Sequence, residues 1–170
     1  MSLAPTRVGI LSTVPSFTLD ISASPTASPT NLAVIESGAS KQTVLKGLVI
    51  HTIGTQTTTG IRNLAFKRVS TANTGTATVP TSNDSTDTFS GIARVGPSAV
   101  GTIGLSAGFK VLFLVPTALT AAPPIVYDFT VRGTLKGLVI PVGTLNSILI
   151  QDSGAAGAAN LNISLIFTEG

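Results

Sequence analysis

Regular alternation of apolar and polar residues is the feature that most restricts what this chain can fold into. The segments YDFTVR (127–132) and NLNISLIFTE (160–169) place an apolar residue at every second position. Successive side chains of a β-strand point to opposite faces, so this period of two is typical of a strand with one buried face. Windows with helical spacing are interrupted by Gly, Pro or several Thr. The sequence therefore predicts an all-β protein.

Further segments have strand character and are separated by clusters of turn-forming residues such as ESGASK, TQTTTG, RVGPSAVGTIG and DSGAAGAAN. We expect these strands at 31–37, 43–53, 62–69, 89–95, 109–115 and 147–152. The glycines of GTIGLSAG match no phosphate-binding spacing and are interpreted as a loop. Many short strands with such turns predict an antiparallel β-sandwich, with a jelly roll as the leading topology.

The hexapeptide LKGLVI occurs twice, at 45–50 and 135–140, and each copy is followed by a Gly-Thr turn. Its apolar residues fall on both faces of an extended strand, which is typical of a strand inside a sheet. We therefore expect both copies at central positions of the sandwich. Convergent strand chemistry is favoured over internal duplication, because the sequences that follow the two copies diverge.

Length and composition suit one domain with a large core. The chain has 170 residues, of which 43% are hydrophobic and only 10% are charged, against roughly 25% charged in ordinary globular domains. Thr and Ser supply the remaining polar surface. Because their side chains are uncharged, there is little electrostatic repulsion between copies of the protein. We expect a single β-sandwich domain over 31–170.

Several partners are disfavoured by the pattern of charge and hydropathy. The net charge of +3 comes from scattered basic residues, and no basic run accompanies stacking aromatics, so we expect no nucleic-acid binding. The longest apolar stretch contains Pro116, Pro123 and Pro124, which a membrane helix rarely accepts together. We expect a soluble protein that does not bind membranes.

Residues 1–30 are interpreted as an N-terminal arm or edge strand. Pro25 and Pro29 favour an extended chain, and the segments VGILST and SFTLDIS have strand character. Such a segment can add a strand to a neighbour's sheet or serve as an edge strand of its own sandwich. The residues expected to contact a subunit or a capsid are Val8, Ile10, Leu11, Phe17, Leu19 and Ile21.

No set of residues predicts catalysis or a cofactor. His51 is the only histidine, and without a nucleophile motif it is interpreted as a partly buried structural residue. Asn83, Asp84 and Asp87 place oxygen ligands in one loop, but Ca²⁺ needs six to eight, so a turn is favoured over an ion site. We expect no enzyme activity, no cofactor and no metal.

The stretches NLAVIESGASKQTVLKGLVIHTIGT and RNLAFKRVSTANTGTATVPTSNDSTD resemble small virion proteins of tailed bacteriophages. The resemblance covers about 31–96. It implies a jelly-roll structural protein on the phage head, most often a decoration or cement protein. Such a protein forms a homo-oligomer, with a trimer favoured, and binds the major capsid protein at the capsid surface of the virion.

Other functions stay open at this point. A tail, spike or fibre protein can share the same sandwich. The coat protein of a small jelly-roll virus is disfavoured because residues 1–40 carry one basic residue, Arg7, whereas an arm that binds the genome would carry several. A carbohydrate-binding module or hydrolase is disfavoured by the absence of Trp and the single Tyr127. From the arm interpretation, we expect a chain that begins at Thr30 to fold but not to oligomerise.

Overall fold

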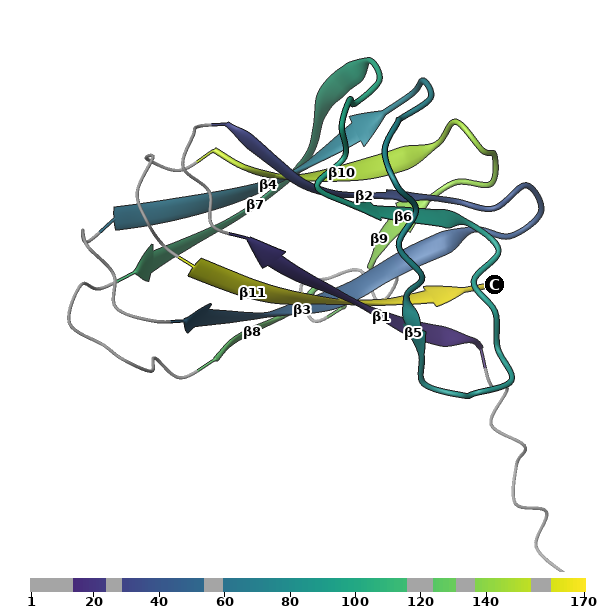
Figure 1. The fold of residues 1–170 in the computed structure, drawn as a ribbon, viewed down its shortest axis with the longest axis horizontal. Helices are drawn as coiled ribbons and strands as arrows, with labels where there is room; N and C mark the ends of the chain where they lie inside the picture. Colours follow the sequence, from purple (N-terminus) through teal and green to yellow (C-terminus); the bar gives the residue numbers. More distant parts are fainter. Residues whose placement is uncertain (1–13, 24–28, 54–59, 116–123, 131–136, 154–159) are drawn as a thin grey trace, which may run out of the picture.

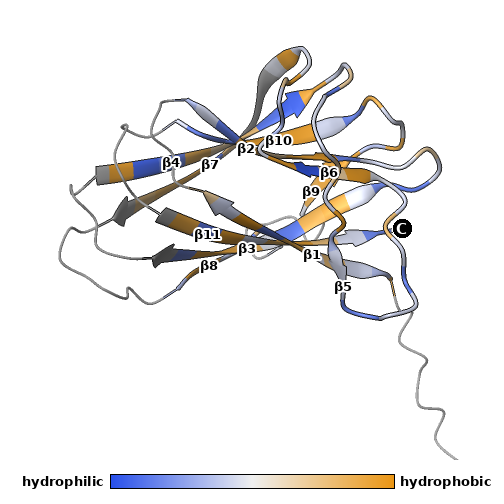
Figure 2. Ribbon diagram, viewed as in Figure 1, coloured by the Kyte–Doolittle hydropathy of each residue, from blue (hydrophilic) through white to orange (hydrophobic). Residues whose placement is uncertain are grey.

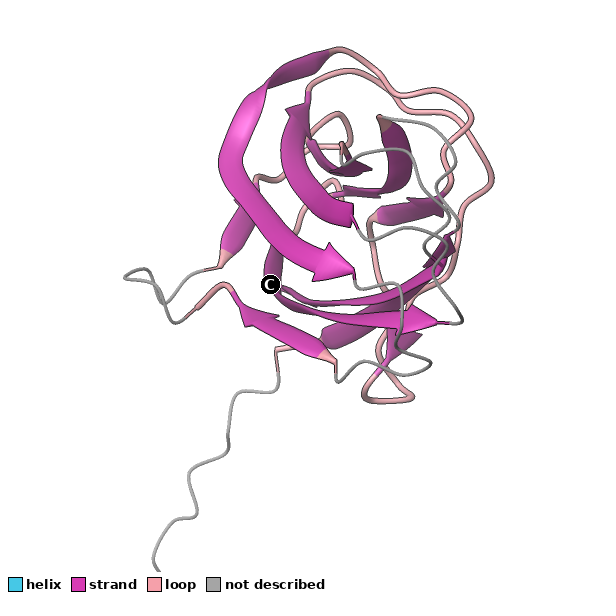
Figure 3. Ribbon diagram, turned by 90° about the vertical axis from the view of Figure 1, so that its left-hand side faces the viewer, coloured by secondary structure: helices cyan, strands magenta, loops and turns pink. Residues whose placement is uncertain are grey.

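The computed structural model describes residues 14–23, 29–53, 60–115, 124–130, 137–153 and 160–170. In these residues the chain forms two antiparallel sheets packed face to face (Figure 1). Figure 3 shows strands and loops in this part of the chain and no helix. No described helix, accordingly, is long and apolar enough to cross a membrane.

The strands are β1 (Ser16–Ala23), β2 (Thr30–Glu36), β3 (Thr43–Ile53), β4 (Gly60–Val69), β5 (Thr81–Ser82), β6 (Ile92–Val95), β7 (Ile103–Val115), β8 (Ile125–Asp128), β9 (Leu138–Ile140), β10 (Ser147–Asp152) and β11 (Asn160–Glu169). Sheet A has the order β5-β1-β11-β3-β8, with β9 also paired to β3. Sheet B has the order β6-β2-β10-β4-β7.

The strand pairings are nested about the connection between β4 and β7. β4 pairs with β7, β3 with β8 and β9, β2 with β10, and β1 with β11. The chain runs outward along β1 to β4 and returns along β7 to β11, and the outgoing strands alternate between the two sheets. This is the jelly-roll arrangement. The predicted all-β antiparallel sandwich of jelly-roll type is confirmed.

The core lies between the two sheets and is built by the alternating strands. Figure 2 shows hydrophobic and hydrophilic bands along β4, and in β11 the buried positions recur at every second residue. The largest fully buried side chains are Phe17, Phe66, Phe167, Leu19, Ile21, Ile35, Leu45, Leu48, Ile50, Leu64, Ile140 and Ile148. These side chains come from both sheets, so each sheet buries its inner face against the other.

Aromatic rings fill both sides of this core. On one side Phe109 of β7 lies 5.0 Å from Tyr127 of β8 and 4.6 Å from Phe129, between ring centroids. On the other side Phe89 lies 5.4 Å from Phe17 and 5.1 Å from Phe167. Edge-to-face pairs of this kind add about 0.5–1.5 kcal/mol beyond the burial of their area.

Most predicted strands are present. Where an observed strand begins or ends at another residue than predicted, a side-chain hydrogen bond or a β-bulge accounts for the difference. β3, β10 and β11 have the predicted bounds. β7 begins at Ile103, so the interpretation of GTIGLSAG as a loop is wrong. Its glycines are accommodated by register shifts in the pairing with β4. The strand predicted at 127–132 ends at Asp128, whose carboxylate accepts hydrogen bonds from the amide and hydroxyl of Thr130 and forms a turn.

The first LKGLVI copy is central in sheet A, as predicted, because β3 lies between β11 and the pair β8 and β9. The second copy is not central. Its described strand is β9, which pairs with the start of β3, so that Leu138 lies opposite Leu45. The two copies are therefore neighbours in one sheet.

The long connection from β4 to β7, residues 70–102, runs beside the first two strands of the sandwich. Its β5 pairs with β1 at the edge of sheet A, and its β6 pairs with β2 at the edge of sheet B. One connection therefore covers the edges of both sheets on this side of the molecule (Figure 1). Covering an edge satisfies backbone groups that otherwise attract other strands.

Candidate functional site

The predicted contact residues Phe17, Leu19 and Ile21 point into the protein's own core. Each side chain is 1% exposed, and β1 lies between β5 and β11 in sheet A. These residues are therefore not available to a subunit or a capsid, and the prediction is wrong for this half of the set. Of the two alternatives for the arm, residues 16–23 are a strand of their own sandwich, so a boundary at residue 30 does not divide the fold. Val8, Ile10 and Leu11 lie outside the described residues.

The loop with Asn83, Asp84 and Asp87 is a turn that is stabilised by hydrogen bonds to Asp84. The Asp84 carboxylate accepts hydrogen bonds from the amide and the hydroxyl of Thr86, at 3.0 and 2.9 Å. These bonds, the amide one first, lower the pKa of Asp84 below its ordinary value. The Asp84 carbonyl accepts from the amide of Asp87 at 3.0 Å. Among the described residues, no group of three His, Cys, Asp or Glu side chains is placed to hold a metal ion.

His51 lies on the outer face of sheet A and is exposed, so the prediction of a partly buried residue is wrong. In the strand register it is beside Asn162, which in turn is beside Ser22. The described neighbours on this face have short side chains that leave His51 in contact with solvent. A shallow hollow of about 330 Å³ results, lined by Asp20, Ile21, Ser22, His51, Asn162, Ile163 and Ser164.

The hollow contains Ser, His and Asp side chains without the geometry of a catalytic triad. The Ser164 hydroxyl donates directly to Asp20 at 2.5 Å, and the Ser22 hydroxyl donates to Asn162 at 2.8 Å. A serine nucleophile must instead give its proton to the imidazole, which the carboxylate orients. Both hydroxyl protons are engaged elsewhere, so the arrangement does not activate a nucleophile.

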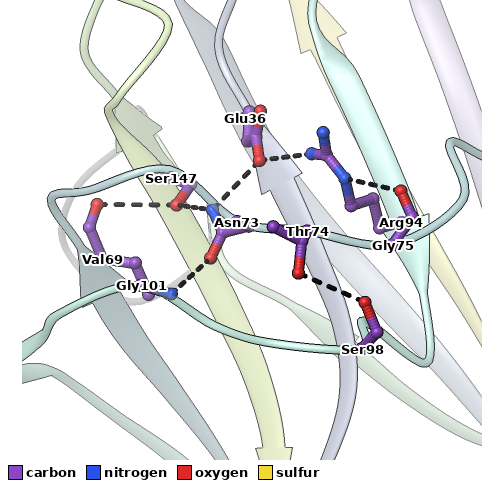
Figure 4. Close-up of polar contacts among 9 residues, drawn as sticks. All are labelled: Glu36, Val69, Asn73, Thr74, Gly75, Arg94, Ser98, Gly101 and Ser147. Carbon is purple, nitrogen blue, oxygen red and sulfur yellow. Dashed lines mark hydrogen bonds and ion pairs between the residues drawn. The ribbon is translucent and has the colours of Figure 1, made fainter.

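The most extensive buried polar cluster joins the 70–102 connection to the end of sheet B (Figure 4). The Asn73 amide donates to Glu36 at 3.0 Å and to the Ser147 hydroxyl at 3.1 Å, and its oxygen accepts from the amide of Gly101 at 3.1 Å. Arg94 forms an ion pair with Glu36 and donates to the Gly75 carbonyl at 3.2 Å. Figure 4 shows these groups pointing at one another and not into a cavity.

The chemistry of this cluster is structural. Asn73, Glu36 and Ser147 are 7%, 5% and 2% exposed, and a buried polar group without a partner is destabilising by about 1–3 kcal/mol. The contacts satisfy these groups and hold both ends of the connection against β2 and β10. The sequence identified this segment only as rich in turn-forming residues, because nothing in it shows which Asn among several is tied to a distant strand.

Three further buried charged side chains hold other parts of the fold together. Arg62 of β4 and Asp152 of β10 form an ion pair of 3.0 Å, with side chains 3% and 1% exposed. The Glu169 carboxylate, 0% exposed, accepts from the amide of Ser90 at 3.1 and 3.2 Å and from its hydroxyl at 2.5 Å. The contacts of Glu169 attach β11 to the 70–102 connection. The sequence does not reveal such pairs, because the partners are far apart along the chain.

None of the Phe and Tyr rings is free to act as a binding platform. All seven Phe and the single Tyr lie in described parts of the chain and are buried or half-buried. All except Phe113 contact another ring, and Phe113 is itself in the core. Recognition of sugars or bases by stacking therefore has no exposed Phe or Tyr ring to use.

Comparison of the chain with family models, with curated proteins and with solved structures finds no match.

Proposed function

We propose that the protein is a non-enzymatic structural component of a virion, most simply a decoration protein that binds and stabilises a phage head. The observation that carries the proposal is the nested jelly-roll order of its strands, an arrangement common in viral capsid domains. The inference from fold to function is by analogy. The resemblance of 31–96 to phage virion proteins supports the same function.

The use of the polar side chains is consistent with this role. The buried clusters around Asn73 and Glu169 attach strands to the 70–102 connection, and the Arg62–Asp152 pair joins β4 to β10. A virion component needs a compact domain that acts through its surfaces. The partners proposed are a second and third copy of the chain and the major capsid protein, with Val8, Ile10 and Leu11 as the remaining proposed contact residues.

A coat protein that builds the shell itself is the second candidate, because the same strand order favours it. The two differ in what the purified protein does alone. A coat protein assembles into closed shells, whereas a decoration protein stays a small oligomer until a shell is added. A carbohydrate-binding module receives no support from the structure, since every Phe and Tyr ring lies in the core or packs against it.

The experiment is co-sedimentation with phage heads that lack the protein. Full-length protein is expected to pellet with such heads and to saturate at a fixed ratio to the shell protein. A chain lacking residues 1–13 serves as the comparison, because those residues precede the described fold. Full-length protein that stays in the supernatant at every concentration contradicts the decoration function. Closed shells formed by the purified protein alone select the coat-protein candidate.

A further inference from the structure

β7 is an exceptionally long edge strand compared with the other edges of this molecule. It has 13 residues and ends the order of sheet B. The strands at the other edges are β5 with 2 residues, β6 with 4, β8 with 4 and β9 with 3. In the described part of the chain, β7 pairs only with β4. Long open edges present a row of unpaired backbone groups to any strand that approaches.

The second half of β7, residues 109–115, pairs with β4 in a regular register. It matches β4 residue for residue from Phe109 opposite Phe66 to Val115 opposite Gly60, and the register shifts lie nearer the start of the strand. Phe109, Val111 and Phe113 face the core. On the solvent side Leu112 is 67% exposed and lies opposite Asn63, and Ile61 of β4, two residues from Asn63, is 61% exposed.

The usual protections of an edge strand are weak here. No Pro occurs in 103–115, and Lys110 is its only charged residue. Lys110 is exposed, so no charge points into the core from the described side chains of this strand. Proteins normally block edges with Pro, lysines, inward charges, β-bulges or short strands, and of these β7 has one lysine, Lys110, and register shifts that lie before residue 109. The exposed side chains of Leu112 and Ile61 favour contact with another protein surface.

We propose that this edge joins two copies of the chain through a two-fold axis, with the β7 strands antiparallel and Leu112 opposite Leu112 of the second copy. An antiparallel edge is self-complementary, so the same surface serves both partners. This register places Lys110 opposite position 114 and keeps the two ammonium groups from facing each other. The low charge of the chain, 10% of residues, adds little repulsion.

The contact joins the two B sheets into one continuous sheet. It also covers the apolar side chains of Leu112 and Ile61 in both copies. A strand of this length spans on the order of 20 Å at about 3.4 Å per residue. The paired segment contributes seven residues, 109–115, from each copy, fewer than the roughly 20–30 residues a side of a stable interface. The dimer is therefore weak and depends on concentration, as suits a surface that acts within a larger assembly. The inference does not depend on the virion function.

The first test uses cysteine cross-linking, since the natural chain contains no cysteine. Leu112→Cys is compared with Val126→Cys, which lies on β8 at a similar exposure of 69% against 67%. Directly opposite residues of an antiparallel pair have Cβ atoms about 4.5–5.5 Å apart, close enough for a disulfide after small adjustment. Under mild oxidation Leu112→Cys is expected to form a covalent dimer much faster than Val126→Cys. Equal rates for the two variants overturn the proposal.

The second test measures mass against concentration by analytical ultracentrifugation. The natural protein is expected to show a mass that rises with concentration, and Leu112→Lys is expected to abolish this rise because two ammonium groups would meet at the axis. Val126→Lys is the matched control and leaves the rise unchanged. Both positions are exposed, so folding is retained, which circular dichroism verifies. A natural protein whose mass does not rise, or a Leu112→Lys variant that associates as before, contradicts the proposed edge contact.

Discussion

Leu45 and Leu138 lie opposite each other in the antiparallel pair of β3 and β9, and each belongs to a copy of LKGLVI. The glycine of each copy lies where another backbone passes close by. A Cβ atom on Gly47 would lie 2.8 Å from the Tyr127 carbonyl oxygen of β8. Gly137 has a φ of +69°, and a Cβ there would lie 2.3 Å from the Leu45 carbonyl oxygen. The repeated hexapeptide thus supplies strand residues and a position without a side chain at one crowded part of sheet A.

Replacing Gly47 with Ala is expected to lower the free energy of unfolding by about 1–3 kcal/mol, since β8 must move to admit the methyl group. Gly104→Ala is the control, because its Cβ would meet only the Arg68 carbonyl oxygen at 3.6 Å, an ordinary contact. Urea unfolding followed by circular dichroism measures both. Equal stability of the two variants would show that β8 does not pack against Gly47.

Removing residues 1–13 is expected to leave the sandwich folded, because β1 begins at Ser16. A chain beginning at Thr30 is expected not to fold, contrary to the expectation from sequence. It lacks Phe17, Leu19 and Ile21, each 1% exposed, whose burial is worth about 1.5–3 kcal/mol apiece. That sum is comparable with the 5–15 kcal/mol stability of a domain. Dispersed amide signals in a proton NMR spectrum of the shorter chain would contradict this prediction.

Replacing Asn73 with Ala is expected to destabilise the protein by about 1–3 kcal/mol, because the Gly101 amide and the buried Ser147 and Glu36 oxygens lose a partner. Hydrogen exchange should speed up first in residues 70–102, which this contact holds. Thr76→Ala in the same connection is the control, since that residue is exposed. Loss of protection spread evenly over all strands would argue against a local role for Asn73.

The pKa of Asp128 is expected to be below its ordinary value, because the hydroxyl and then the amide of Thr130 donate to its carboxylate. A lowered folded-state pKa gives stability that is present above the unfolded value of about 3.9 and is lost as the pH falls through the folded-state pKa. Thr130→Val should raise the Asp128 pKa. Carboxyl carbon NMR titration measures it, and an unchanged pKa in the variant would refute the hydroxyl's role.

The sandwich could be predicted because the alternation of apolar and polar residues is a local pattern that consecutive residues show directly. In β11, for example, the predicted bounds match those observed. It did not predict which strands become neighbours, and so it misjudged β1. The apolar residues of β1 indicated burial correctly, but burial against a partner and burial against sheet B of the same chain leave the same pattern in the sequence. His51 was misjudged for a related reason, because strand period does not show whether a second layer covers a face.

We propose that the protein is a repeated structural component of a virion. The most direct test is to purify intact virus particles from the source of the chain and to measure its copy number against the major capsid protein by quantitative mass spectrometry. A fixed ratio matching the symmetry of the head lattice is expected under this proposal. Absence from the particle, or a few copies that remain with the tail after heads and tails are separated, would contradict it.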